Sequence, residues 1–181
     1  MGGSIAVGYS GAGGSEALAR ATEQAERSGA RLTIEHVCVP GSPLTGATHT
    51  GLELLDPPLA RAYAKAQIRL GGHRVAWEIC SGDPAAELVH TSVGAHLLVI
   101  GAGEGGRSVR RIIRHTHSPV VVARSARLPA HAPFAGHVVV GDKRRGVIGR
   151  ARTGDVPLTV ATEATCPVAI VPVEHDEGNL L

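Results

Sequence analysis

The clearest pattern in the chain is a short apolar run that ends in a cluster of glycines. Aliphatic residues fill positions 97–100, and glycine follows at 101, 103, 105 and 106. A run this short predicts a strand buried on both faces, and the glycines predict a turn whose backbone approaches a ligand closely. Val109, Ile112 and Ile113 follow at helical spacing, before the apolar run Pro119–Val122. This segment therefore predicts a strand, a glycine loop, a helix and a strand, and such a loop at a helix start suits an anion such as phosphate.

The same alternation of apolar runs and helical periodicity extends over the first two thirds of the chain. The strands expected there are Ser4–Gly8, Leu32–Val39 and the alternating, edge-like Arg74–Cys80. The helices expected there are Ser15–Ser28, Leu59–Leu70 and one that Asp83 caps and that stops near Gly94. A turn over 9–14 and a long loop over 41–58 separate them. Strands that alternate with helices predict a parallel, doubly wound α/β sheet.

The C-terminal part repeats the opening pattern. Val138–Gly141 matches Leu98–Gly101, and the run 165–168 matches 117–120, with a basic loop and a predicted helix over 156–165 between them. We therefore expect a partial second copy of the strand, loop, helix and strand unit. The predicted organisation is an α/β domain over 1–126, a linker over 127–136, the partial copy over 137–173 and a disordered tail over 174–181.

Composition narrows the function classes. The aromatic residues make up 2% of the chain and the formal net charge is +2, so base stacking and strong attraction to nucleic acid or a membrane are disfavoured. Cys38, Cys80 and Cys166 lie far apart and fit no metal spacing, which favours reduced thiols in a cytoplasmic protein. No signal peptide and no apolar stretch long enough to span a bilayer is expected.

Several motifs, taken in order, resemble those of the universal stress protein family. They are the strand and turn 6–11, the helix start Gly82-Asp83-Pro84-Ala85, the strand and loop 98–101, and the run from Arg110 to His115 into Ser118–Val122. Together they cover roughly residues 4 to 124. The resemblance implies a five-stranded parallel sheet, to which the C-terminal unit adds a β-α-β extension. The C-terminal repeat resembles a second such domain that has lost its middle.

The resemblance also implies a nucleotide site, because many family members bind ATP. The candidate contacts are Gly8, Tyr9, Ser10, Val37, Gly101, Gly103, Gly105, Gly106, Arg107, Ser108 and Arg144. The family pattern has an acidic residue after the first strand and a loop of Gly, two residues, Gly, nine residues and Gly-Ser/Thr. Here Ser10 replaces the acid, the loop after Gly101 is shortened, and the repeat has Arg144 and Asp155 at pattern positions. These departures predict weak or absent ATP binding.

Other interpretations of single motifs stay open. Residues 101–106 also match the G-x-G-x-x-G pattern of an NAD(P)-dependent oxidoreductase, although the helix that follows is short. Ser10 lies on a strand-to-helix turn that is similar to a nucleophile elbow, except that Ala12 stands where glycine is expected. His115 and His117 are either metal ligands or, more simply, cations at a helix C-terminus, and we expect no metal site. The arginines over 107–114 either clamp phosphate or form a solvated helix face.

The resulting hypothesis is a stress-response regulatory or binding module, not an enzyme, with degenerate ATP binding. The strand over 119–124 predicts assembly, because it is an apolar sheet edge that pairs either with a second chain or with 167–173 of the same chain. An unidentified protein partner is compatible with this hypothesis. The alternative is a genuine ATP or AMP binder whose loop is completed by the repeat, and a third, less favoured, is the oxidoreductase.

Overall fold

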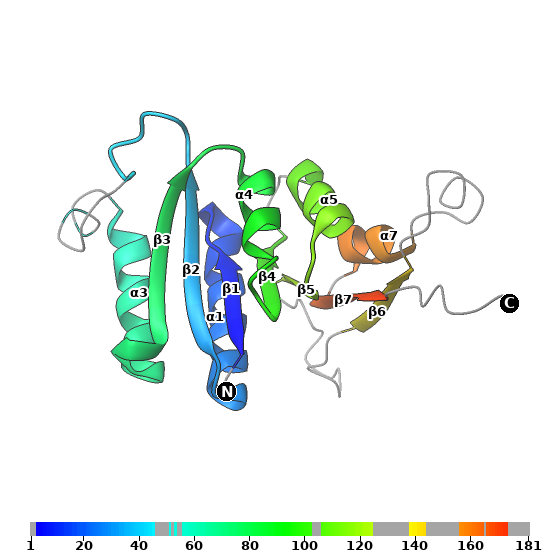
Figure 1. Cartoon of the computed structure of the whole chain (residues 1–181), viewed down its shortest axis with the longest axis horizontal. Coiled ribbons are helices and arrows are strands. Elements are labelled where there is room, and N and C mark those ends of the chain that lie inside the picture. The colour runs from blue at the N-terminus through cyan, green and yellow to red at the C-terminus, as the bar shows by residue number, and fades with distance from the viewer. Residues whose placement is uncertain are drawn as a thin grey trace, which may run out of the picture.

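The computed structural model describes residues 3–45, 51, 53, 56–102, 106–124, 138–143, 156–164 and 166–173. Its strands form one sheet with the order β3-β2-β1-β4-β5-β7-β6 (Figure 1). The strands are β1 (Ser4–Gly8), β2 (Arg31–Cys38), β3 (Val75–Ser81), β4 (Leu97–Gly101), β5 (Val120–Ala123), β6 (Val138–Lys143) and β7 (Val168–Val173). This confirms the predicted α/β class with a mostly parallel sheet, and it places β3 at a sheet edge as its alternating pattern predicts.

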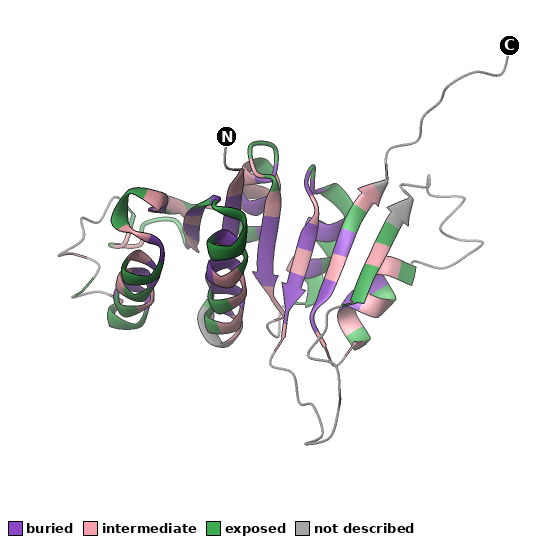
Figure 2. Ribbon diagram, turned by 90° about the horizontal axis from the view of Figure 1, so that it is seen from below, coloured by how far each residue is buried: buried purple, intermediate pink, exposed green. Residues whose placement is uncertain are grey.

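Helices cover both faces of the sheet. They are α1 (Gly11–Ser28), α3 (Pro57–Leu70), α4 (Pro84–Thr91), α5 (Gly106–His115) and α7 (Val156–Glu163), with a short 3₁₀ turn at Gly72–Arg74. The first two pack on one face, and the other three lie in a row on the opposite face (Figures 1 and 2). None of the helices in the described ranges has the length and apolar character needed to cross a membrane.

The apolar runs of the sequence become two cores, one on each face of the sheet. The first contains Val7, Leu32 and Ile34 from the strands, packed against the small-residue stripe of α1 and against α3. The second contains Leu98 and Ile170, packed beneath α4, α5 and α7. The central strands β1 and β4 contribute to both cores, which is why their sequences are almost continuously apolar.

The C-terminal unit extends the same sheet. β5 pairs with β7 in antiparallel orientation, with Val120 opposite Ile170 and Val122 opposite Val168. β6 then pairs with β7 in parallel. The free edge of β5 is therefore covered from within the chain. Homodimerisation of the whole chain stays a prediction.

Most element boundaries agree with the sequence to within two residues, and the differences have local causes. Asp56 starts α3 two residues early, because its side chain accepts a hydrogen bond from the Leu59 amide (3.0 Å). α4 ends at Thr91 rather than near Gly94. The expectation that a turn over 9–14 precedes a helix starting at Ser15 is wrong, because the helix begins at Gly11 with Ser10 as its N-cap residue. The predicted linker and tail lie outside the described residues.

Candidate functional site

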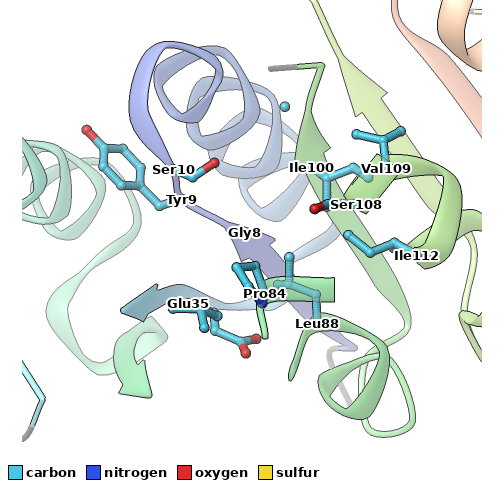
Figure 3. Close-up of a pocket in the computed structure, with 12 residues that line it drawn as sticks. Gly8, Tyr9, Ser10, Glu35, Pro84, Leu88, Ile100, Ser108, Val109 and Ile112 are labelled. Carbon is cyan, nitrogen blue, oxygen red and sulfur yellow. The ribbon is translucent and has the colours of Figure 1, made fainter. Parts of the chain in front are cut away.

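A cavity of about 180 Å³ opens where the carboxyl ends of β1, β2 and β4 meet α4 and α5 (Figure 3). Between β1 and β4 the strand order reverses direction along the chain, and ligands of open α/β sheets bind at such switch points. The lining residues are Gly8, Tyr9, Ser10, Glu35, Val37, Pro84, Leu88, Ile100, Gly101, Ser108, Val109 and Ile112. The cavity walls are mainly apolar, with polar groups at a few positions, which is the usual makeup of a small-molecule site.

The cavity brings together six of the eleven residues that the sequence predicts for a nucleotide site. These are Gly8, Tyr9, Ser10, Val37, Gly101 and Ser108. Gly106 and Arg107 form the exposed start of α5, next to Ser108, but do not line the cavity. Gly103, Gly105 and Arg144 lie outside the described residues, as does part of the G-x-G-x-x-G motif.

Two glycines of the site lie in close contact with a neighbouring helix. A Cβ atom on Gly101 would lie 2.3 Å from the backbone oxygen of Gly13, at the N-terminal end of α1. A Cβ atom on Gly8 would lie 2.8 Å from Cδ1 of Leu88 on α4. Gly101 therefore lets α1 approach the end of β4 more closely than a side chain would allow, and Gly8 leaves room for the side chain of Leu88. The cavity is the space that remains between these close contacts.

Ser10 occupies the position between β1 and α1. It is exposed, its backbone is extended (φ −148°, ψ 127°), and its hydroxyl makes no capping hydrogen bond to α1. The hydroxyl is therefore available to a ligand, but it lacks the charge of a carboxylate. The preceding Tyr9 is held by its backbone, whose oxygen lies 2.9 Å from Nδ1 of His36.

An ion pair joins α4 and α5, the two helices that border the cavity. Asp83 caps α4, because its Oδ1 accepts a hydrogen bond from the Ala86 amide (2.9 Å), as the sequence predicts. This bond, and secondarily the charge of Arg111, lowers the pKa of Asp83. Arg111 of α5 in turn donates to Oδ2 of Asp83 at 2.9 Å. The N-terminal part of α5, which carries a partial positive charge, borders the cavity through Ser108.

The structure adds a residue that the sequence analysis missed, Glu35 of β2. Its side chain is 3% exposed and lines the cavity. Oε1 accepts a weak hydrogen bond from Sγ of Cys80 (3.7 Å), and Oε2 has no hydrogen-bond partner within the part of the chain that the structure describes. The sequence signal that could have identified Glu35 is a carboxyl side chain within a predicted apolar strand.

Burial dominates the electrostatics around Glu35. It raises the pKa of Glu35, and the charges of Glu78 and Glu87 act in the same direction, while the side chains of Thr91 and Cys80 lower it to a smaller extent. Burial, followed by the charge of Glu35, raises the pKa of the Cys80 thiol to about 11. Cys80 therefore stays protonated at neutral pH and is a poor nucleophile.

The arrangement is suited to binding a small molecule with an apolar part. Its walls are apolar, a helix N-terminus and a serine hydroxyl lie near its mouth, and one carboxyl group lies inside. In the described ranges no group of three or more His, Cys, Asp or Glu side chains is arranged to hold a metal ion. A second hollow of about 420 Å³ lies between α1 and α3 on the opposite face, and of the predicted site residues that the structure describes only Tyr9 lines it.

Comparison with known proteins identifies the family of the chain. The model of the universal stress protein family matches residues 3–124. The UspA protein of Lactobacillus plantarum superposes with a TM-score of 0.51 at 21% identity, over 68% of this chain and 98% of that one. A universal stress protein of Archaeoglobus fulgidus gives 0.51 at 18% identity, over 67% and 93%.

A further solved structure of the same fold is a universal stress protein in complex with cAMP. It superposes with a TM-score of 0.50 at 20% identity, over 67% of this chain and 96% of that chain. No curated protein matches the sequence. The family model covers the strands β1 to β5, which carry the described cavity, and the solved structures share their fold. The chain therefore belongs to the universal stress protein family.

Proposed function

We propose that the chain is a regulatory binding module of the stress response that holds an adenine nucleotide weakly in the described cavity and does not hydrolyse it. The observation that supports this most is the position of the cavity, between the end of β1 and the N-terminus of α5. A ring fits between apolar walls there, and a phosphate group reaches amides at a helix start. One relative of the same fold was solved with cAMP bound.

Weak binding follows from the polar groups around the cavity. A hydrogen bond to a charged group contributes roughly 1.5–3 kcal/mol, so replacing a ribose-binding carboxylate by the neutral Ser10 lowers affinity roughly ten- to hundredfold. The shortened loop after Gly101 removes further phosphate contacts. We therefore expect a dissociation constant for Mg-ATP in the submillimolar range or weaker.

The substitution Ser10→Asp tests this account. Aspartate is as good an N-cap residue as serine, so α1 keeps its stability while the ribose gains a charged acceptor. Calorimetry is expected to show roughly ten- to hundredfold tighter binding of AMP and Mg-ATP by S10D. Ser10→Asn is the matched control, because it caps the helix without a charge and leaves affinity near that of the wild type. A wild-type dissociation constant in the low micromolar range, or turnover of ATP, would contradict the proposal.

The proposal of a binding module rather than an enzyme rests on the chemistry of the lining residues. Cys80, the thiol nearest to Glu35, stays protonated, and the Ser10 hydroxyl lies on an exposed helix cap. Regulation would then act through assembly or a protein partner. The three cysteines are free in the structure, which supports a reducing compartment such as the cytoplasm.

A second candidate is a full ATP or AMP binder whose loop is completed by the C-terminal repeat. It is supported by the position of α7, which lies beside α5 in the same core. Arg144, between β6 and α7 in the chain, would then pair with a phosphate group. Loss of micromolar ATP binding in Arg144→Ala, with AMP binding less affected, would favour this candidate over weak binding.

A further inference from the structure

The second hollow, here called the α1–α3 groove, lies on the face of the sheet opposite the described cavity. Its volume of about 420 Å³ falls within the roughly 300–1,000 Å³ of sites that hold small organic molecules. Leu18 of α1 and Ala62 and Ala66 of α3 give it an apolar lining. The buried hydroxyl of Thr22 donates to the backbone oxygen of Leu18 (2.7 Å), so this part of the groove offers a ligand apolar contacts.

The remaining polar side chains of the groove are cations or hydroxyl groups. Arg61 and Lys65 lie one turn apart on α3, are exposed, and form no ion pair within the described residues. The hydroxyls of Tyr9 and Ser15 make no hydrogen bond in that part of the chain either. No aspartate or glutamate is among the described lining residues. Because arginine and lysine donate hydrogen bonds but accept none, the groove favours a ligand with an anionic group.

The two ends of the groove differ. Tyr9, Ser15 and Arg61 lie where α1 and α3 begin, and Figure 3 shows the Tyr9 ring turned away from the other residues of the described cavity. At the other end Arg69 pairs with Glu26 of α1 (2.6 Å), so its charge is already neutralised. From Arg61 to Arg69 the helix rises about 12 Å. One end therefore carries the free donors, and an apolar channel leads away from them.

We infer that the α1–α3 groove binds a medium-chain aliphatic carboxylate, with Arg61 pairing with the carboxylate group and the apolar lining holding the chain. A guanidinium group donates two parallel hydrogen bonds to a carboxylate, and the hydroxyls of Tyr9 and Ser15 can donate to its remaining lone pairs. The apolar lining is recessed between two helices, so a single alkyl chain reaches it and a lipid surface does not. The site lies outside the described cavity, so the inference does not depend on nucleotide binding.

The test compares two ligands that differ in the head group. Decanoate and decanol, which has the same chain length without the charge, are titrated by calorimetry into the full-length wild type, Arg61→Met and Arg31→Met. Methionine keeps an apolar stem and removes the charge. Arg31 is exposed at the start of β2 and does not line the groove, so R31M is the matched control. Wild type and R31M are expected to bind decanoate roughly tenfold more tightly than decanol, whereas R61M is expected to bind both equally.

The substitution Ala19→Phe tests the apolar part of the site. Ala19 is an exposed residue of α1 that lines the groove, so phenylalanine occupies the space of the chain without entering the core. A19F is expected to weaken binding of both ligands roughly tenfold or more, with an unchanged melting temperature.

Four results would overturn the inference. They are equal affinity of the wild type for both ligands, an unchanged preference in R61M, binding that A19F does not weaken, and binding to phosphatidylglycerol vesicles without binding of free decanoate. Displacement of decanoate by AMP would also overturn it, because it would place decanoate in the described cavity. Failure of the wild type to bind AMP would contradict the proposed function and leave this inference standing.

Discussion

Replacing Ile170 by alanine tests whether the C-terminal unit is part of the cooperative core. Ile170 lies on β7, is 1% exposed, and pairs with the fully buried Val120 of β5. It belongs to the core beneath α5 and α7. Truncating a buried isoleucine to alanine costs about 2–5 kcal/mol, through lost burial and the cavity left behind. For a chain of 181 residues this lowers the melting temperature by roughly 4–20 °C.

The position of the single tryptophan makes the assay informative. Trp77 lies on β3, at the opposite edge of the sheet, where its ring stacks on Tyr63 with centroids 5.3 Å apart. Urea unfolding is followed by Trp77 fluorescence and by circular dichroism in parallel. If the seven strands unfold as one unit, Ile170→Ala shifts both transitions to lower urea by the same amount.

Val139→Ala is the matched control. Val139 is a 61% exposed aliphatic residue on β6, so its truncation removes little buried surface and is expected to change the free energy of unfolding by about 0.5 kcal/mol or less. An early loss of circular dichroism signal in I170A, with an unshifted Trp77 transition, would refute the shared core. It would show that β6, α7 and β7 unfold separately from the rest of the sheet.

Three further predictions concern the β5 edge, Gly101 and Glu35. Deletion of residues 137–181 exposes the edge of β5 and the buried side chains of Val120 and Val122. The truncated protein should therefore have a lower melting temperature or form a dimer in light scattering. An unchanged mass and an unchanged melting temperature would contradict this. Gly101→Ala should cost about 1–3 kcal/mol in urea unfolding and weaken ligand binding, because of its clash with Gly13, whereas Gly94→Ala, with open space around it, should be nearly neutral. Burial raises the pKa of Glu35 in the folded state, so the contribution of Glu35 to the free energy of unfolding is complete below the ordinary pKa of 4.5 and is lost as the pH rises through the folded pKa. Above pH 4.5 the stability of the wild type relative to Glu35→Gln should therefore fall. A stability difference that does not change with pH would contradict the raised pKa.

The features that local sequence determines were predictable. Val109, Ile112 and Ile113 at helical spacing are all buried on α5, and Asp83 followed by Pro84 starts α4. Gly29 adopts the left-handed conformation (φ 69°) that ends α1. Each of these depends on a residue and its near neighbours, so the pattern carries the information. The order of such motifs was also enough to identify the family that the family model confirms.

The features that depend on contacts between distant segments were decided only in the tertiary structure. The first turn of α1 is helical in spite of its glycines, which favour a turn by themselves, and its Gly13 lies so close to Gly101 of β4 that a Cβ atom there would clash with it. β5 pairs with β7 in antiparallel orientation, and these two strands are far apart in the sequence, so no local pattern could predict their orientation. The burial of Glu35 depends on Gly8 and Leu88 from other elements, and a carboxyl group becomes buried and unpaired only when its neighbours remove water from it.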